Sequence, residues 1–130
     1  MTAMPSDEVQ AQGLILTREL FFGSKVTGTA AALGFRIEMV GEVAQVRERL
    51  AALGSSCRCL FVDLSLPGLS LDELMDVLGA CDVRPKVIAF GAHVHADRLE
   101  AARQAGCDEV LPHSRFSASL PEILMESLTG

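Results

Sequence analysis

Apolar residues recur along this chain in two alternating patterns, which predict five strands and five helices. Short runs that are almost entirely apolar are typical of buried strands. The longer segments between them carry an apolar residue every three or four positions, which is typical of helices packed on one face. The predicted strands are 13–17, 35–40, 59–64, 86–90 and 108–112, and the predicted helices are 19–34, 42–54, 70–81, 95–106 and 119–128.

Local residue signals support several of these helix boundaries. Ser70 precedes the third helix and Glu73 follows three positions later, which is the pattern of a capping box. Gly34, Gly54 and Gly106 stand where three helical patterns end, and glycine is the usual residue after a helix C-terminus. We therefore expect short connections between compact elements.

The strict alternation of strand and helix predicts one parallel sheet with helices on both faces. Residues 59–64 and 86–90 are almost entirely apolar, so these strands should lie in the centre of the sheet. Residues 35–40 alternate between apolar and polar, which favours an edge strand. We predict an α/β, doubly wound five-stranded sheet in the order 2-1-3-4-5.

Composition limits the possible roles of the protein. Its 130 residues and its ordinary apolar content suit one domain at 13–130, preceded by a flexible N-terminus at 1–12. A net charge of −6 argues against nucleic-acid binding, which needs a basic surface. The first residues lack the apolar core of a signal peptide, and no apolar run reaches the length of a membrane span, so we expect a cytoplasmic protein away from membranes. Four cysteines without a CxxC pair are expected to be reduced and structural.

A lone aspartate ends the central strand 59–64 and is followed at once by a turn. Parallel strands carry their ligand sites at the carboxyl edge of the sheet, so Asp63 is a candidate functional group. Pro67 and Gly68 belong to the turn that follows it. The residues expected at the same edge are Thr17, Arg18, Gly91, Ala92, His93 and His113.

Two segments resemble the response-regulator receiver family, which has the flavodoxin-like (CheY-like) fold. "VDLSLPG" is similar to the third strand of that family, and the resemblance places Asp63 at the phosphoaccepting position and Pro67 at the loop proline. "AGCDEVLPHSRF" is similar to the family segment that leads through the fifth strand. The resemblance covers most of the chain, and because no output domain follows, it implies a stand-alone receiver.

Four positions depart from the family pattern. Thr17 and Arg18 occupy the positions at which receivers carry the acidic pair that holds Mg²⁺. Gly91 occupies the position of a serine or threonine, and His113 that of a lysine. An arginine repels Mg²⁺, which prefers carboxylate ligands. The resemblance therefore implies an atypical pseudo-receiver without a metal site, a cofactor or an enzymatic activity.

Three functions remain open from the sequence. In the first, the protein is a signalling interaction module in which Arg18 pairs with Asp63 in place of the metal. In the second, Asp63 still accepts a phosphoryl group in a two-component phosphorelay, and Arg18 and His113 supply the positive charge. In the third, Asp63 and the histidines bind a metal such as Zn²⁺. The three histidines are His93, His95 and His113.

The expected partner is another signalling protein, either a histidine kinase or a downstream effector, and a homodimer is a further possibility. By analogy with the receiver family, we expect a docking surface on the helix at 95–106, the strand at 108–112 and the helix at 119–128. Arg103, Arg115 and Phe116 are its candidate exposed contacts. A P-loop pattern is absent, which argues against nucleotide binding.

Overall fold

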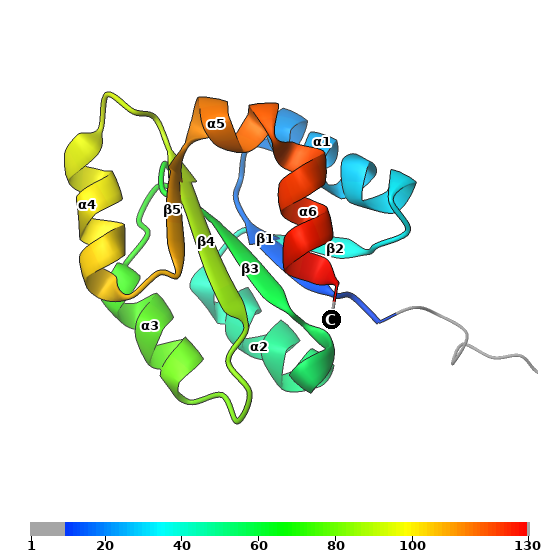
Figure 1. The fold of residues 1–130 in the computed structure, drawn as a ribbon. Coiled ribbons are helices and arrows are strands. Elements are labelled where there is room, and N and C mark those ends of the chain that lie inside the picture. The colour runs from blue at the N-terminus through cyan, green and yellow to red at the C-terminus, as the bar shows by residue number, and fades with distance from the viewer. Residues whose placement is uncertain (1–9, 130) are drawn as a thin grey trace, which may run out of the picture.

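The computed structural model describes residues 10–129, and it confirms the predicted sheet. All neighbouring strands pair in parallel, and their order is β2-β1-β3-β4-β5 (Figure 1). The strands are β1 (Gly13–Leu16), β2 (Ile37–Val40), β3 (Cys59–Asp63), β4 (Lys86–Gly91) and β5 (Glu109–Pro112). The helices are α1 (Leu20–Ala32), α2 (Val43–Leu53), η2 (Gly54–Ser56), α3 (Leu71–Gly79), α4 (Ala96–Ala105), α5 (His113–Ala118) and α6 (Leu120–Leu128).

The central strands are apolar on both sides because each side faces a separate core. In β3, Leu60 and Val62 pack into the cluster formed with α2, α3 and α4. Phe61 points the other way, into the cluster formed with α1, α5 and α6. Helices therefore cover both faces of the sheet, as Figure 1 shows. The alternation of side chains along a strand explains how one apolar run serves two cores.

The Ser70 half of the predicted capping box forms, and Gly106 ends α4 as predicted. The Ser70 hydroxyl accepts a hydrogen bond from the backbone N–H of Glu73 at 3.1 Å and caps α3. Gly106 ends α4 with a left-handed backbone (φ 106°), a conformation that costs glycine little. Its N–H donates to the carbonyl of Arg103 at 3.1 Å, which satisfies one of the last carbonyl groups of the helix.

Helix α5 is an element that the sequence pattern did not predict. Residues 113–118 hold a single large apolar residue, Phe116, and therefore show no helical period. In the structure Phe116 is 0% exposed, and its ring stacks on that of Phe90 with centroids 4.6 Å apart. The prediction that Phe116 is an exposed contact is wrong, because this ring completes the core between α1, α6 and the sheet.

The packed fold begins before the predicted domain boundary at residue 13. Ala11 is buried, and Gln12 donates its N–H to the carbonyl of Arg36 at 2.9 Å. The Gln12 carbonyl accepts from the N–H of Arg58 at 2.7 Å. The rest of the predicted flexible segment, apart from Gln10, lies outside the described residues. Across residues 10–129, no helix has both the length and the apolar character needed to cross a lipid bilayer.

Candidate functional site at the carboxyl edge of the sheet

The sheet register brings the ends of β1 and β3 together. Leu16, the last residue of β1, pairs with Val62 of β3, so Thr17 and Asp63 follow side by side at the carboxyl edge. Asp63 in turn pairs with Phe90 of β4. The predicted position of Asp63 at this edge thus follows from parallel pairing alone.

Asp63 is a buried carboxylate whose two oxygens are both hydrogen-bonded. Asp63 is only 6% exposed. Its Oδ2 accepts from the Thr17 hydroxyl at 2.6 Å, and its Oδ1 accepts from the N–H and the hydroxyl of Ser65 at 2.9 and 2.6 Å. Three donors thereby replace part of the water that burial removes.

Thr17 is the centre of this hydrogen-bond network. Its hydroxyl donates to Asp63 and accepts from the N–H of Glu19 at 3.0 Å. Its own N–H donates to the carbonyl of Val40 at 2.9 Å, at the end of β2. One buried threonine therefore connects Asp63 with the end of β2 and the start of α1.

Arg18 does not pair with Asp63. Its guanidinium Nε donates to the carbonyl of Gly41 at 3.2 Å, and the side chain is exposed. No salt bridge within residues 10–129 joins the two residues. Successive residues of an extended chain point to opposite sides, so once Thr17 faces Asp63, Arg18 faces away. The predicted ion pair is wrong.

The acidic side chains at this edge are engaged in hydrogen bonds within the chain. Mg²⁺ needs near-octahedral oxygen coordination, usually with one or two carboxylates. Asp63 already accepts three hydrogen bonds, and Glu19 caps α1, where its Oε1 accepts from the N–H groups of Phe21 and Phe22 at 2.8 and 3.5 Å. In the described part of the chain, no cluster of three histidine, cysteine or acidic side chains is placed to hold a metal ion.

A side chain at Gly91 would be tight against Leu64. A Cβ atom there would lie 3.2 Å from the Cβ of Leu64 and 3.5 Å from the Cδ2 of Leu99. The Leu64 side chain, buried against α4, fills the space next to the end of β4. The glycine therefore leaves the space that Leu64 fills, in addition to lacking a hydroxyl group.

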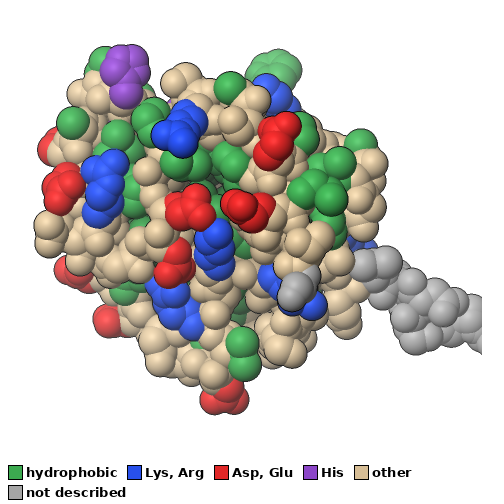
Figure 2. Space-filling view, in the orientation of Figure 1, with side chains coloured by type: hydrophobic (Ala, Val, Ile, Leu, Met, Phe, Trp, Pro, Cys, Tyr) green, Lys and Arg blue, Asp and Glu red, His purple; other side chains and the backbone are tan. Residues whose placement is uncertain are grey.

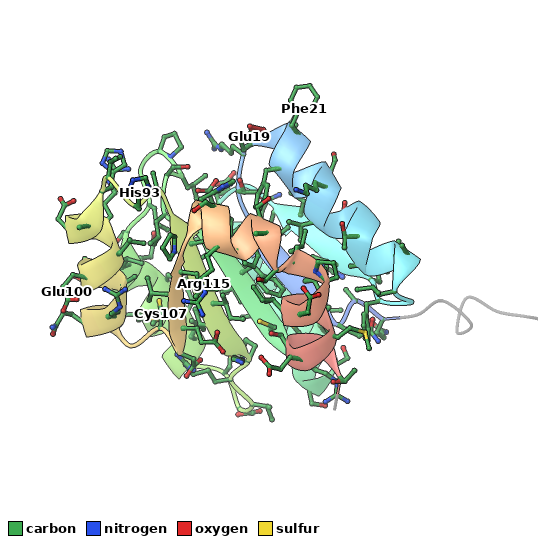
Figure 3. The ribbon with its side chains drawn as sticks, turned by 45° about the horizontal axis from the view of Figure 1, so that its top comes forward. Glu19, Phe21, His93, Glu100, Cys107 and Arg115 are labelled. Carbon is green, nitrogen blue, oxygen red and sulfur yellow. The ribbon has the colours of Figure 1, made fainter. Side chains whose placement is uncertain are left out.

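The three histidines do not form one cluster with Asp63 within residues 10–129. His113 begins α5, and its ring packs 4.3 Å from that of Phe22 and 5.7 Å from that of Phe90. His93 and His95 are exposed just before α4, where Figure 2 shows histidine and Figure 3 labels His93. His113 is thus held by aromatic packing, and His93 and His95 are exposed to solvent.

The turn after Asp63 has the geometry that its sequence indicates. The carbonyl of Asp63 accepts from the N–H of Leu66 at 3.1 Å, and Gly68 adopts a positive φ of 75°. Pro67 and Gly68 are exposed. The role of Ser65 was missed by the sequence reasoning, although an aspartate with a serine two residues later is a recognisable Asx-turn pattern.

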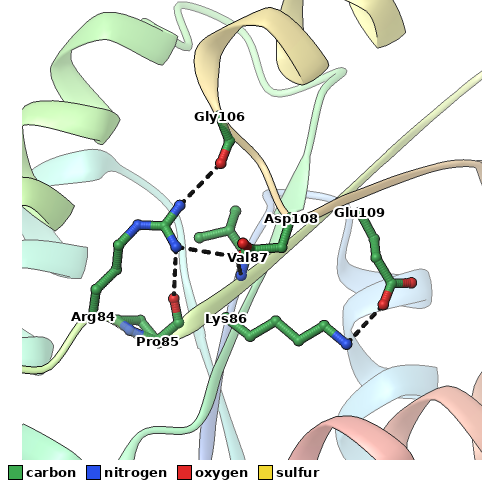
Figure 4. Close-up of polar contacts among 7 residues, drawn as sticks. All are labelled: Arg84, Pro85, Lys86, Val87, Gly106, Asp108 and Glu109. Atoms are coloured by element: carbon green, nitrogen blue, oxygen red, sulfur yellow. Dashed lines mark hydrogen bonds and ion pairs between the residues drawn. The ribbon is translucent and has the colours of Figure 1, made fainter.

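Ion pairs gather at the opposite edge of the sheet. At the amino ends of β4 and β5, Lys86 pairs with Glu109 at 2.7 Å (Figure 4). The Asp108 carboxylate accepts from Arg84 at 3.1 Å and from the N–H of Val87 at 2.7 Å. These contacts join β4 and β5 at their amino ends.

The predicted exposed contacts are placed on two helices. Arg103 lies on α4 and pairs with Glu100 at 3.2 Å, one turn away. Arg115 lies exposed on α5 (Figure 3). Phe116, the third member of the predicted set, is in the core.

The cysteines have the character of core residues. Burial raises the pKa of the Cys57 thiol to about 11 and raises the pKa of Cys59 further. Burial also raises the pKa of Cys107. A thiol is reactive as the thiolate, so burial keeps these groups inert near neutral pH.

Comparison with known proteins identifies the fold. No protein-family model and no curated protein sequence matches this chain. A response-regulator receiver domain from Bermanella marisrubri has a TM-score of 0.75 at 15% identity, covering 92% of this chain and 100% of that one. The receiver domain of a sensor histidine kinase from Pseudomonas aeruginosa PAO1, with magnesium in its active site cleft, has a TM-score of 0.74 at 21% identity, covering 91% and 98%. A response regulator from Thermotoga maritima has a TM-score of 0.69 at 17% identity, covering 93% and 99%. The chain thus has the flavodoxin-like fold of receiver domains.

Proposed function

We propose that this protein is an atypical receiver that signals through protein–protein contacts, independently of Mg²⁺-dependent phosphorylation at Asp63. One observation carries the proposal: the Asp63 carboxylate is closed by hydrogen bonds from Thr17 and Ser65. A receiver that binds Mg²⁺ needs open carboxylate oxygens at this point.

The chemistry of phosphoryl transfer explains why this closure matters. A carboxylate that attacks a phosphoryl group approaches a concentrated negative charge, which a metal ion or a positive side chain must offset. Arg18 points to Gly41, and His113 is packed against Phe22. Neither group is directed at Asp63 by a hydrogen bond or an ion pair within residues 10–129. The hydrogen bonds from Thr17 and Ser65 also occupy most of the lone pairs through which Asp63 would react.

The proposed partner is another signalling protein in the cytoplasm, and the proposed role is docking without a catalytic activity. Arg103 and Arg115 remain candidate contacts because both are exposed. The presence of four free cysteines agrees with a reducing compartment.

The test is to treat the purified chain with acetyl phosphate and Mg²⁺ and to measure its intact mass. We expect no phosphoryl adduct and no change in melting temperature with millimolar Mg²⁺. An adduct that disappears in Asp63→Asn would overturn the proposal and establish the phosphoacceptor alternative.

A gain-of-function variant sharpens this test. Thr17→Asp places a second carboxylate next to Asp63 and removes the hydroxyl donor, so it should create measurable Mg²⁺ affinity by calorimetry. Arg18→Asp is the matched control, because it introduces the same carboxylate at a position that faces away from Asp63. Equal Mg²⁺ binding by both variants would contradict the described geometry.

A further inference from the structure

The connection between β3 and α3 is rich in leucine. Residues 64–71 have the sequence LSLPGLSL, in which every second residue is leucine on average and no side chain is charged. Leu64 and Leu66 are buried, whereas Leu69 and Leu71 are only partly buried. Connecting segments run over the surface of a protein, so these last two leucines leave apolar area in contact with solvent. The segment therefore presents an apolar surface at the carboxyl edge of the sheet.

A pocket of about 290 Å³ lies between this segment and α4. Its apolar wall combines the four leucines with Pro67 and with Ala101 of α4. Helices α3 and α4 cover the same face of the sheet (Figure 1), and the pocket lies where these helices meet the carboxyl edge. Ligands of open parallel sheets bind outside this edge, so the place of the pocket suits a binding site.

Arg98 supplies the charge of the pocket. It is the third residue of α4, it is exposed, and it lines the pocket together with the leucines. Within residues 10–129 its guanidinium takes part in no salt bridge, whereas Arg103 of the same helix pairs with Glu100 at 3.2 Å. No acidic side chain among the described residues lines the pocket. The pocket therefore combines an apolar wall with one cation that has no counter-ion.

The polar groups of Ser65, which also lines the pocket, are already engaged. The Ser65 hydroxyl donates to Oδ1 of Asp63 at 2.6 Å, and the Ser65 N–H donates to the same oxygen at 2.9 Å. Neither donor is left for a ligand in the pocket. Arg98 is therefore the group that can hold the polar end of a ligand, and the charge of that end must be negative.

The volume of the pocket sets the size of the ligand. A water molecule occupies about 30 Å³ in the liquid, so a pocket of about 290 Å³ has room for roughly ten non-hydrogen atoms. A carboxylate matches the guanidinium of Arg98, because the two groups can form a pair of parallel N–H···O bonds. A hydrocarbon chain of about eight carbons, its carboxylate included, fills the remaining space and covers the leucines.

We propose that the pocket between residues 64–71 and α4 binds a medium-chain monocarboxylate such as octanoate, with its carboxylate on Arg98 and its chain against Leu69 and Leu71. Ser65 belongs both to the wall of this pocket and to the hydrogen bonds of Asp63, so the ligand contacts the turn that closes Asp63. The proposal goes beyond the proposed function, because it adds a small-molecule input to an interaction module. It stands whether or not Asp63 accepts a phosphoryl group.

Isothermal titration calorimetry of the full chain with sodium octanoate tests the site, in buffer without Mg²⁺ or a phosphoryl donor. We expect saturable binding of one octanoate per chain with a dissociation constant below about 1 mM, as is reasonable for a ligand of this size. Octylamine has the same chain and the opposite charge, so Arg98 should repel it and no saturable binding should occur. Absence of octanoate binding, or equal binding of octylamine, would overturn the proposal.

Two pairs of variants locate the binding. Arg98→Gln should raise the dissociation constant of octanoate at least about tenfold, because the charge-assisted pair is lost, whereas Arg47→Gln changes an exposed arginine of α2 and should have no effect. Ala101→Phe should fill the pocket and abolish binding, whereas Ala51→Phe places the same ring on an exposed alanine of α2 and should not. Equal effects within either pair would place the binding elsewhere and contradict the site.

A series of chain lengths tests the apolar wall. From butanoate to octanoate, each added methylene should lower the dissociation constant by about two- to fourfold, because it removes further apolar area from water. Dodecanoate should bind no more tightly than octanoate does, since the pocket has room for only about ten non-hydrogen atoms. An affinity that is independent of chain length, or one that keeps rising to dodecanoate, would contradict a chain enclosed in this pocket.

Discussion

Thr17→Val tests whether Thr17, and not Arg18, accommodates the buried Asp63 carboxylate. Valine has nearly the same shape as threonine, so the change removes the hydroxyl with little effect on packing. A hydrogen bond to a charged group contributes about 1.5–3 kcal/mol to stability. The hydroxyl also accepts from the N–H of Glu19, which loses its partner. We therefore expect the free energy of unfolding to fall by about 2–4 kcal/mol, a large part of a typical total of about 5–15 kcal/mol.

The assay is urea unfolding followed by circular dichroism, with the slope of the transition used to check two-state behaviour. A double-mutant cycle isolates the contact between the two side chains. In an Asp63→Ala background, Thr17→Val should cost at least about 1 kcal/mol less than it does in the wild type, because the acceptor is already gone. Arg18→Ala is the matched control and should change stability by no more than about 0.5 kcal/mol, since its side chain is exposed.

Two results would refute the reasoning. The first is a loss of less than about 0.5 kcal/mol for Thr17→Val, or the same loss in both backgrounds, either of which would show that the hydroxyl does not support Asp63. The second is a loss near 3 kcal/mol for Arg18→Ala, which is the cost of breaking a buried ion pair and would restore the interpretation from sequence.

The remaining predictions concern the buried core. Phe116→Ala should lower the free energy of unfolding by about 3–5 kcal/mol in the same urea assay, because Phe116 is fully buried; a neutral effect would mean that it is exposed after all. Cys57 and Cys59 should resist iodoacetamide at pH 8 in the folded protein and react in urea, as measured by peptide mass spectrometry. Burial raises the pKa of Cys57 to about 11, so the unfolded state loses this thiol proton at a lower pH than the folded state does. The free energy of unfolding should therefore decline from about pH 9 to about pH 11, and a flat profile over that interval would contradict the burial of Cys57. Gly91→Ser should destabilise the fold by about 1–3 kcal/mol, because its Cβ meets Leu64, and should not confer phosphorylation; a stabilised variant would show that the site can open.

The fold could be predicted from the sequence because its signals are local and periodic. Apolar runs at the central strands, amphipathic segments between them and the caps at Ser70 and Gly106 each depend on neighbouring residues. Strict alternation of strand and helix then leaves few topologies, since parallel crossovers have one hand. The position of Asp63 at the carboxyl edge followed from the same logic.

The surroundings of Asp63 were only partly predictable. The sequence placed both Thr17 and Arg18 after β1, and charge favoured Arg18 as the partner of a carboxylate. The orientation of the strand end decided otherwise: Thr17 faces Asp63 and Arg18 faces Gly41. The Ser65 contacts depend on the turn after β3, and its Asx-turn pattern was the one local signal that could have revealed them.

The sequence by itself determined which segments form strands and helices, how they are ordered, and that a single aspartate ends a central strand. Only the tertiary structure decided which side chains meet that aspartate, that Phe116 enters the core through its stack on Phe90, and that Phe21 stays outside it. Periodicity specifies the face of an element on which a residue lies. The contacts of that residue depend on elements distant in the sequence, whose register and packing are set only when the whole sheet assembles.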